Sequence, residues 1–272
     1  MPRSLGEKIS EGATADIHAW APGQVLKLSK AGVPQWLGEH EARVTRAVFA
    51  AGGPAPEVFG DVTLEGRFGI VMERLDGPTL LQLLRTRAIT IERAGAILAT
   101  LYLSVHKTPP PPDVSSLSGW INDAARLPGG VLPKHIVAGV VALIERLPPG
   151  DGLCHGDLHA GNVIMTAEAP RIIDWTATVR APAALDLGRC HLTLTELVPD
   201  GVDPERPRRL NAAVQSEYAR LRGMSPAALT AAMEPYLPIL RTMALADLVW
   251  TPAQRERLIQ RVEATLRSGS HP

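Results

Sequence analysis

The sequence predicts an α+β protein of two lobes, in which a small antiparallel-sheet lobe with one main helix precedes a mostly helical lobe. Short runs of alternating apolar and polar residues are typical of strands and fill most of the first 72 positions, whereas long helical patterns dominate after residue 79. Between these parts, Asp76-Gly77-Pro78 is a strong turn signal. We therefore expect an N-terminal lobe at 1–75, with a hinge at about 73–77, and a helical C-terminal lobe at 76–272.

Glycine and proline separate the predicted elements of the first lobe. Gly12, Pro22 and Gly23 divide its first part into strands, the last of which contains Val25-Leu26-Lys27-Leu28. Apolar residues then recur with a helical period until two glycines and a proline close the segment. The predicted order is strands within 5–30, a helix at 36–50, and strands at 57–64 and 67–72. Together they form a five-stranded sheet with one helix.

Helical periodicity dominates the second lobe. The run Pro109 to Pro112 cannot be helical, because proline lacks the N–H donor, and we expect a stiff spacer there. Glycines and polar residues interrupt the periodicity at 151–175, where Val163-Ile164-Met165 and Ile172-Ile173 are predicted to form a short hairpin. The predicted helices are 79–87, 90–107, 118–127, 133–147, 183–198, 204–222, 225–247 and 251–267.

The composition excludes several classes of protein. Hydrophobic residues make up 45% and charged residues 21% of the 272 positions, which is typical of a globular protein and not of a disordered chain. Lys+Arg and Asp+Glu both number 28, so no broad charge favours nucleic acid or an anionic membrane as a partner. No stretch predicts a membrane span or a signal core, so we expect a cytoplasmic protein in which Cys154 and Cys190 are reduced.

Three polar side chains suited to phosphate chemistry lie in the segment 151–175. Asp157 and Asn162 are five residues apart in one glycine-containing loop, and Asp174 follows the apolar pair Ile172-Ile173. Burial of such groups costs free energy unless a ligand or an ion uses them. Phosphoryl transfer needs an aspartate that orients the acceptor hydroxyl, together with an asparagine and a second aspartate that hold Mg²⁺. The spacing therefore predicts a phosphotransferase site.

Other interpretations of this segment account for fewer of its residues. A single Asp or Asn in such a loop is usually a turn former, but three at this spacing favour a site. His155 and His159 are four residues apart, yet a loop lacks the helical geometry that would align them on a metal, so we expect both to brace the loop. Cys154 beside His155 would suit a thiol nucleophile, but adjacent side chains on an extended strand point to opposite faces, so we expect Cys154 in the core.

At these residues the sequence resembles the aminoglycoside phosphotransferase and choline-kinase-like family, small-molecule kinases with the two-lobed protein-kinase-like fold. Residues 155–162, His-Gly-Asp-Leu-His-Ala-Gly-Asn, match its H-G-D-x-x-x-x-N loop, and Ile173-Asp174-Trp175 stands where protein kinases carry D-F-G. The resemblance covers most of the chain and weakens in its C-terminal part. It implies that Asp157 is the catalytic base or hydroxyl-orienting group and that Asn162 and Asp174 are magnesium ligands.

A kinase site also needs a strand lysine for the α- and β-phosphates and an acidic helix residue that holds this lysine. Lys27 is the candidate, because it interrupts an apolar strand. Helical geometry favours Glu41 over Glu39 as its partner, since at about 100° per residue Glu41 falls on the apolar stripe and Glu39 on the opposite face. An inward carboxylate needs a cationic partner, which Lys27 supplies. The alternative is a purely structural pair or two surface residues.

Two backbone segments are predicted to complete the nucleotide site. Gly12, Ala13 and Thr14 are small residues of the first hairpin that let N–H groups approach a phosphate, although no Walker or G-x-G-x-x-G pattern is present there. The resemblance makes Glu73 and Leu75 part of the hinge that binds adenine, through the C=O of Glu73 and the N–H of Leu75. A plain linker between strand and helix is the alternative.

The acceptor is expected to be a small molecule with a hydroxyl group. Only eleven residues separate Asp174 from Asp186 and no A-P-E motif follows, so a protein-kinase activation segment is absent from the sequence. Gly156 also replaces the arginine with which many protein kinases read an activation-loop phosphate. The resemblance further implies that Asp186 begins a helix and braces the catalytic loop.

The sequence thus predicts an O-phosphotransferase that uses ATP or GTP with Mg²⁺ and acts as a monomer or weak dimer. An aminoglycoside or another antibiotic is one acceptor class, and choline, a sugar, homoserine or a similar metabolite is the alternative. A nucleotide-binding pseudokinase and an unusual protein kinase are the competing functions. The carboxylates considered for a polycationic acceptor are Asp157, Glu196, Asp200, Glu234 and Asp247.

Overall fold

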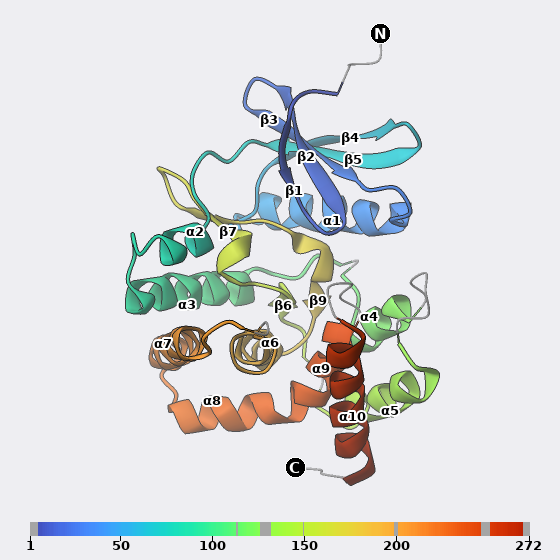
Figure 1. The fold of residues 1–272 in the computed structure, drawn as a ribbon, viewed down its shortest axis with the longest axis vertical. Coiled ribbons are helices and arrows are strands. Elements are labelled where there is room, and N and C mark those ends of the chain that lie inside the picture. The colour runs from blue at the N-terminus through green and yellow to red at the C-terminus, as the bar shows by residue number, and fades with distance from the viewer. Residues whose placement is uncertain are drawn as a thin grey trace.

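The computed structural model describes residues 5–112, 114–125, 132–148, 150–198, 201–245 and 251–268. The first part of the chain forms a five-stranded sheet of order β1-β2-β3-β5-β4, in which every neighbouring pair is antiparallel (Figure 1). Its elements are β1 (Lys8–Glu11), β2 (Ala15–Ala21), β3 (Gln24–Ser29), α1 (Gln35–Ala50), β4 (Val58–Leu64) and β5 (Arg67–Glu73).

Helix α1 packs against one face of this sheet. Val25, Phe68 and Ile70 from the strands are buried in one cluster with Ala42 of α1. Because side chains alternate along a strand, Lys27 lies on the same face of β3 as Val25 and therefore points toward α1. A lysine is thus placed on the inner, apolar side of the sheet, where a solvated side chain would not be expected.

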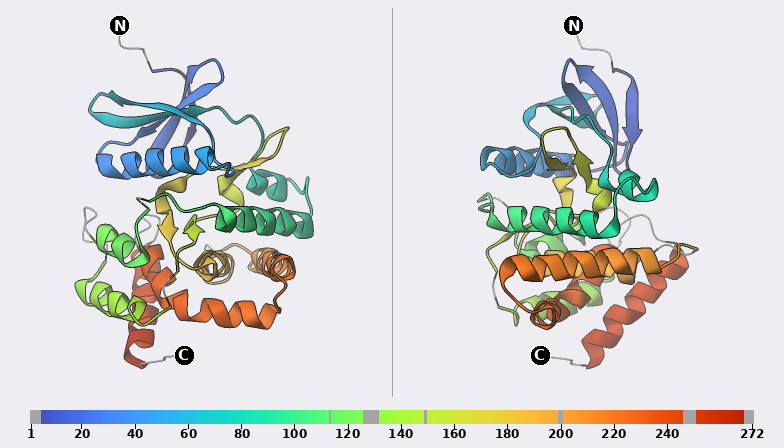
Figure 2. Two further views of the ribbon diagram at one scale, coloured as in Figure 1. Left: turned by 180° about the vertical axis from the view of Figure 1, so that it is seen from behind. Right: turned by 90° about the vertical axis from the view of Figure 1, so that its left-hand side faces the viewer.

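The second part of the chain is mostly helical and lies below the sheet and α1 (Figures 1 and 2). Its helices are α2 (Leu80–Arg85), α3 (Ile91–Lys107), α4 (Leu117–Ala124), α5 (Lys134–Ile144), α6 (Ala183–Thr195), α7 (Glu205–Arg222), α8 (Pro226–Met233), α9 (Leu237–Leu245) and α10 (Pro252–Ser268). Two short antiparallel ladders lie among the loops that connect these helices. β6 (Leu153–Cys154) pairs with β9 (Val179–Arg180), and β7 (Val163–Met165) pairs with β8 (Pro170–Ile172). The predicted α+β class, a small antiparallel sheet before a helical part, is confirmed.

The sequence prediction of one helix over 225–247 is wrong. This segment is divided into α8, a 3₁₀ turn at Glu234–Tyr236 and α9. Pro235 lies at the break. Its ring clashes with the carbonyl four residues earlier and it has no N–H to donate, so an α-helix does not continue through it. Residues 246 and 247 of the predicted helix, like residues 126 and 127 of another, lie outside the described residues.

Helix α1 also shares a core with the helical part of the chain. Val44 and Val48 of α1 are buried together with Leu98 and Tyr102 of α3 and Leu158 of the loop after β6. This packing fixes α1, and with it the side chains on its inner face, relative to the loops that follow β6 and β8. None of the described helices is both long and apolar enough to cross a membrane.

Candidate active site

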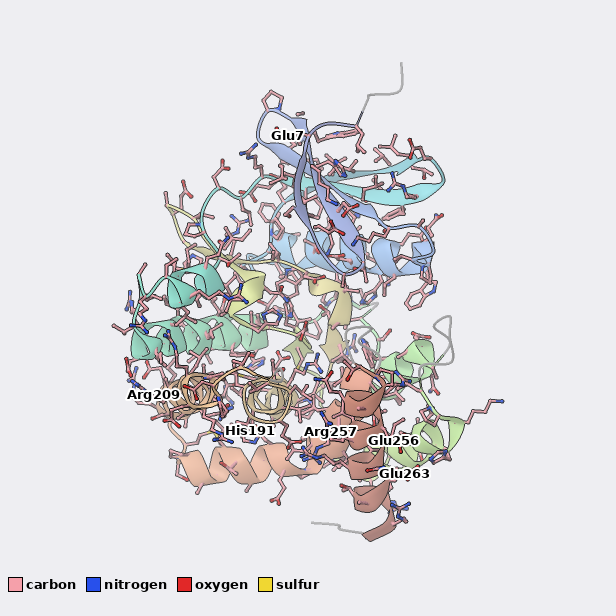
Figure 3. The ribbon with its side chains drawn as sticks, viewed as in Figure 1. Glu7, His191, Arg209, Glu256, Arg257 and Glu263 are labelled. Carbon is pink, nitrogen blue, oxygen red and sulfur yellow. The ribbon has the colours of Figure 1, made fainter. Side chains whose placement is uncertain are left out.

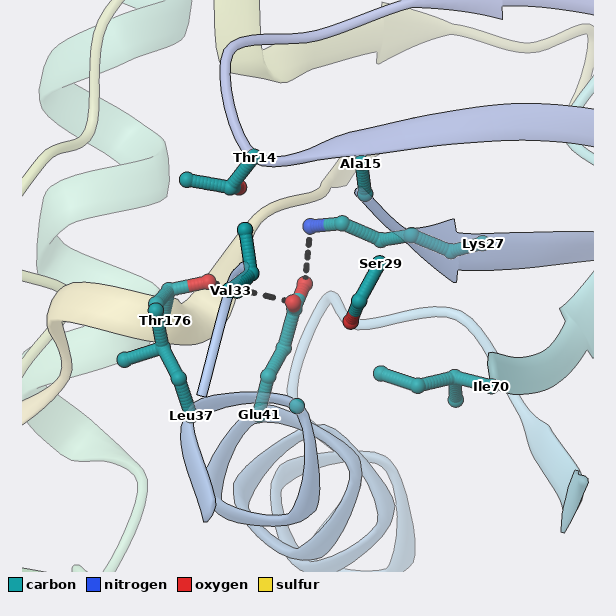
Figure 4. Close-up of a pocket in the computed structure, with 10 residues that line it drawn as sticks. Thr14, Ala15, Lys27, Ser29, Val33, Leu37, Glu41, Ile70 and Thr176 are labelled. Atoms are coloured by element: carbon teal, nitrogen blue, oxygen red, sulfur yellow. Dashed lines mark hydrogen bonds and ion pairs between the residues drawn. The ribbon is translucent and has the colours of Figure 1, made fainter. Parts of the chain in front are cut away.

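Lys27 and Glu41 form a buried ion pair between β3 and α1. Lys27 Nζ lies 2.6 Å from Glu41 Oε1, and the two side chains are 13% and 6% exposed (Figure 4). Glu39, the other candidate partner, is exposed and accepts a hydrogen bond from Gln35. The structure therefore contains the ion pair with Glu41 that the helical period predicted.

Asp174 joins this pair from the loop after β8. Its Oδ1 lies 3.0 Å from Lys27 Nζ and accepts a hydrogen bond from Thr176 Oγ1 at 2.9 Å. Thr176 Oγ1 also lies 3.1 Å from Glu41 Oε2 (Figure 4). The hydroxyl is thus within hydrogen-bond distance of both carboxylates and can donate its one proton to either. Asp174 has φ 65° and ψ 67°, a left-handed conformation that Asp and Asn tolerate better than other residues with a Cβ.

The charges of this cluster shift the pKa values of its members. Burial alone would lower the pKa of Lys27, but the carboxylates of Asp174 and Glu41 outweigh it and hold that pKa above the ordinary value. The Lys27 ammonium lowers the pKa of Asp174 to about 2. Burial raises the pKa of Glu41, while the Lys27 ammonium and the Thr176 hydroxyl oppose this change. At neutral pH the Lys27 ammonium and the Asp174 carboxylate are therefore both charged, and Glu41 lies within ion-pair distance of the ammonium.

The loop from His155 to Asn162 is held from below by α6. Asp186, in the first turn of α6, accepts the N–H of His155 through Oδ2 at 2.9 Å and the N–H of Gly156 through Oδ1 at 2.8 Å. Gly156 has φ 81°, and a Cβ there would lie 2.1 Å from the carbonyl oxygen of Ala177, so only glycine fits this close approach. These two hydrogen bonds are the bracing contact expected for Asp186.

Ile173 connects this loop to the Asp174 cluster. Its N–H donates to the carbonyl oxygen of Asn162 at 3.0 Å, which extends the β7–β8 ladder by one step. Its C=O lies 3.2 Å from His155 Nε2. His155 Nδ1 accepts the N–H of Asp157, so the imidazole is neutral with its proton on Nε2, and burial lowers its pKa accordingly. Asn162 and Asp174 are thus brought to the same end of one short hairpin.

The Asp157 side chain accepts hydrogen bonds from Arg189 and lies near His159. Arg189 of α6 donates to Asp157 Oδ1 from Nε at 3.3 Å and from Nη2 at 3.1 Å. His159 Nε2 lies 3.7 Å from the other oxygen, Oδ2. Asn162 Nδ2 donates to the backbone carbonyl of Asp157 at 3.0 Å, which fixes the two residues relative to each other. The loop thus holds the carboxylate of Asp157 and the amide of Asn162 close to each other.

The predicted phosphate-binding residues lie in the turn between β1 and β2. The N–H of Gly12 donates to Ala15 at 2.8 Å and closes a tight turn. Thr14 lines a pocket that also contains Lys27 and Glu41 (Figure 4). Gly12 and Ala13 are exposed beside it and do not line it.

The predicted hinge residues lie at the end of β5 and just after it. The carboxylate of Glu73 accepts hydrogen bonds from Arg171 Nη2 of β8 at 2.8 Å and from the N–H of Glu57 at 3.1 Å. Leu75 is half-buried in the segment that leads to α2. Neither residue lines the pocket at Lys27, so adenine binding at Glu73 and Leu75 stays a prediction.

Potential metal-ligand atoms from three side chains lie within 4.8 Å of one another, those of His106, Cys154 and Asp186. His106 uses both ring nitrogens, one on Tyr218 OH at 2.7 Å and one on Asp186 at 3.2 Å. Burial raises the pKa of Cys154 well above its ordinary value, so its thiol stays protonated and near the carbonyl of Ala181. This arrangement is a hydrogen-bond network in the core, and the thiol-nucleophile alternative for Cys154 has no support in it.

Residues 7–224 match the sequence model of the protein family APH, which is described as the phosphotransferase enzyme family. The chain belongs to this phosphotransferase enzyme family. It is therefore an enzyme that acts as a kinase. A search of the curated proteins found no match.

Solved structures of other kinases share the fold of this phosphotransferase at low identity. A protein described as a fructosamine-3-kinase from Haemophilus somnus 129PT has a TM-score of 0.63 at 12% identity, over 95% of this chain and 92% of that chain. A choline kinase from Cryptosporidium parvum Iowa II has a TM-score of 0.58 at 15% identity, over 98% and 90%. The streptomycin-ATP-APH(2'')-IIa ternary complex has a TM-score of 0.55 at 16% identity, over 97% and 92%. These similarities confirm the protein-kinase-like fold.

Two residues of the candidate site were not predicted from the sequence. Thr176 lies only two positions after Asp174, but nothing in the local pattern indicates that its hydroxyl reaches Glu41. Arg189 lies three positions after Asp186 and so on the same face of α6, which is the one signal that would have found it.

The carboxylates considered for a polycationic acceptor do not gather in the described part of the chain. Glu196 is neutralised by Arg241 at 2.7 Å and Arg261 at 2.8 Å, and Glu234 is exposed on a 3₁₀ turn. Asp200 and Asp247 lie outside the described residues. Other charged side chains of α7 and α10, among them Arg209 and Glu256, project outward from the helical part (Figure 3).

Proposed function

We propose that this phosphotransferase moves the γ-phosphoryl group of ATP or GTP, in the presence of Mg²⁺, to a hydroxyl group of a small molecule. The observation that carries the proposal is the cluster of Lys27, Glu41 and Asp174 beside the loop that bears Asp157 and Asn162. A nucleotide donor is supported by the fold that the chain shares with a structure in which ATP is named.

In this proposal Lys27 binds the α- and β-phosphates. An ammonium group has three N–H donors, and two of those of Lys27 point to Glu41 and Asp174. The third remains for a phosphate oxygen. Glu41 holds the ammonium in place from α1, and the turn that contains Gly12, Ala13 and Thr14 covers the phosphates through its backbone N–H groups.

Asn162 and Asp174 are the proposed ligands of Mg²⁺. The donor set fits this cation, because magnesium prefers carboxylate and carbonyl oxygens. The Nδ2 of Asn162 is used on the Asp157 carbonyl, which leaves its Oδ1 for a cation. When bound there, Mg²⁺ would supply positive charge that offsets the negative charge of the phosphate groups.

Asp157 is proposed to orient the acceptor hydroxyl and to receive its proton as the new O–P bond forms, while the bond from the γ-phosphorus to the β–γ bridging oxygen breaks and the nucleoside diphosphate leaves with the electron pair. Its Oδ1 is occupied by Arg189, so Oδ2 is the oxygen that would accept the hydroxyl hydrogen bond. The acceptor is proposed to bind between this loop and the C-terminal helices. Because Asp157 and Glu196 are both paired with arginine, the described residues give a polycationic antibiotic no advantage over a neutral metabolite.

The proposal is tested first by nucleotide binding and then by turnover. We expect ATP with Mg²⁺ to raise the melting temperature, since a ligand at about 100 times its Kd stabilises the folded state by about 2.7 kcal/mol. Consumption of ATP is then measured with aminoglycosides, macrolides, choline, sugars, fructosamine compounds and homoserine as acceptors. Turnover with one of these classes supports the proposal. Binding without turnover on any acceptor favours the pseudokinase, and transfer to a generic protein favours a protein kinase.

A further inference from the structure

Arg189 is a buried arginine whose guanidinium lies against the carboxylate of Asp157. Its side chain is 8% exposed, and Nε and Nη2 approach the same oxygen, Oδ1, at 3.3 and 3.1 Å. A guanidinium stays charged at any pH that the protein tolerates. The interaction is therefore a charge-assisted pair between a buried guanidinium and a carboxylate that is 33% exposed, so one of its partners is held in place while the other still faces solvent.

Helix α6 holds the catalytic loop at two levels. Asp186 accepts the N–H groups of His155 and Gly156 and so fixes the loop backbone. Arg189 follows three positions later on the same helix face and reaches the Asp157 side chain. A single rigid element thus sets both the position of the loop and the rotamer of its carboxylate.

We propose that Arg189 is a positioning residue for phosphoryl transfer. It holds Oδ1 of Asp157, leaves Oδ2 toward the acceptor hydroxyl, and offsets the repulsion between this carboxylate and the incoming γ-phosphate. The repulsion is a real cost, because two like charges a few ångströms apart repel each other even in water and more strongly where water is excluded. This inference rests on the proposed function, in which Asp157 faces the acceptor.

A lysine at this position would not do the same. Lysine carries a point charge on a flexible stem, whereas the planar guanidinium presents two donors to one carboxylate in a fixed orientation. Arg189→Lys therefore retains the charge and loses the geometry, while Arg189→Ala loses both. The two variants separate charge compensation from orientation.

The test measures steady-state kinetics of the wild type, Arg189→Ala, Arg189→Lys and a control, Arg206→Ala. Arg206 is exposed and donates to a backbone carbonyl, that of Leu84, away from Asp157. We expect kcat to fall about 100-fold in Arg189→Ala and less in Arg189→Lys, since a misplaced catalytic group costs about this factor. The KM for ATP should stay within a few-fold of the wild-type value, and the control should keep its kcat.

Chemical rescue distinguishes positioning from a purely structural role. Millimolar guanidinium or methylguanidinium should restore part of kcat in Arg189→Ala, saturably, and should not restore it in Arg206→Ala or in an Asp157→Asn, Arg189→Ala double variant. Unchanged kcat in a folded Arg189→Ala, or a change in KM alone without rescue, would overturn the inference. If Arg189→Ala does not fold, a wild-type kcat in Arg189→Lys would overturn it. A wild type inactive on every acceptor would instead overturn the proposed function, and this inference with it.

Discussion

Replacement of Glu41 by glutamine tests the energetics of the buried cluster. The substitution keeps the shape of the side chain and removes its charge, so Lys27 loses the partner at 2.6 Å and keeps Asp174 at 3.0 Å. Removal of one partner from a buried ion pair typically costs 3–5 kcal/mol. Because Asp174 remains and its side chain is 43% exposed, we expect the low end of this range, about 3 kcal/mol. At the usual entropy of unfolding per residue this lowers Tm by about 5 °C.

Urea and thermal unfolding of Glu41→Gln and Glu39→Gln measure this difference directly. Glu39 lies on the exposed face of the same helix, so its substitution should change the free energy of unfolding by less than about 0.5 kcal/mol. In the same samples, kcat/KM of Glu41→Gln should fall at least about tenfold, since Lys27 is no longer held in one position. Equal stability losses for the two variants would refute the role assigned to Glu41.

Three further predictions concern the same site. Gly156→Ala should lower the urea midpoint and kcat together, because its Cβ would meet the Ala177 carbonyl at 2.1 Å; wild-type values for both would contradict the close approach of these two loops. The pKa of Asp174 is lowered to about 2 by Lys27, so its stabilising contribution is present above about pH 4 and is lost as the pH falls toward 2. The stability difference between wild type and Asp174→Asn should therefore shrink over that range and stay constant from pH 5 to 7, and a constant difference down to about pH 2.5 would exclude the linkage. Thr176→Val should cost about 1–3 kcal/mol and weaken Mg²⁺-dependent nucleotide binding, as measured by calorimetry, whereas unchanged affinity would show that the hydroxyl does not order the cluster.

Much of the fold was predictable because local patterns were strong. Strand alternation and turn residues located the five-stranded sheet, and the helical period located α1 and most later helices. The break at Pro235 was missed because apolar periodicity continues on both sides of it, although the proline itself was a signal. Strands β6 and β9 have two residues each and leave no periodic pattern to read.

Some features of the candidate site were likewise predictable from local sequence patterns, and others were not. The spacing of Asp157 and Asn162 and the helix face of Glu41 are local properties, so the sequence indicated them, and the ion pair of Glu41 with Lys27 is present. The contact between Arg189 and Asp157 joins residues 32 positions apart and depends on how α6 packs beneath the loop. No periodicity or propensity reports such packing. The catalytic and metal-binding roles of these residues stay predictions until activity is measured.

Transfer of a labelled γ-phosphoryl group tests the central claim most directly. Wild type and Asp157→Asn are incubated with γ-labelled ATP, Mg²⁺ and the acceptor that supports turnover, and the labelled product is quantified. We expect product from the wild type, and a loss of at least about 100-fold in the variant with its affinity for ATP retained, because the carboxylate acts on the acceptor and not on the nucleotide. Full transfer by Asp157→Asn would contradict the account.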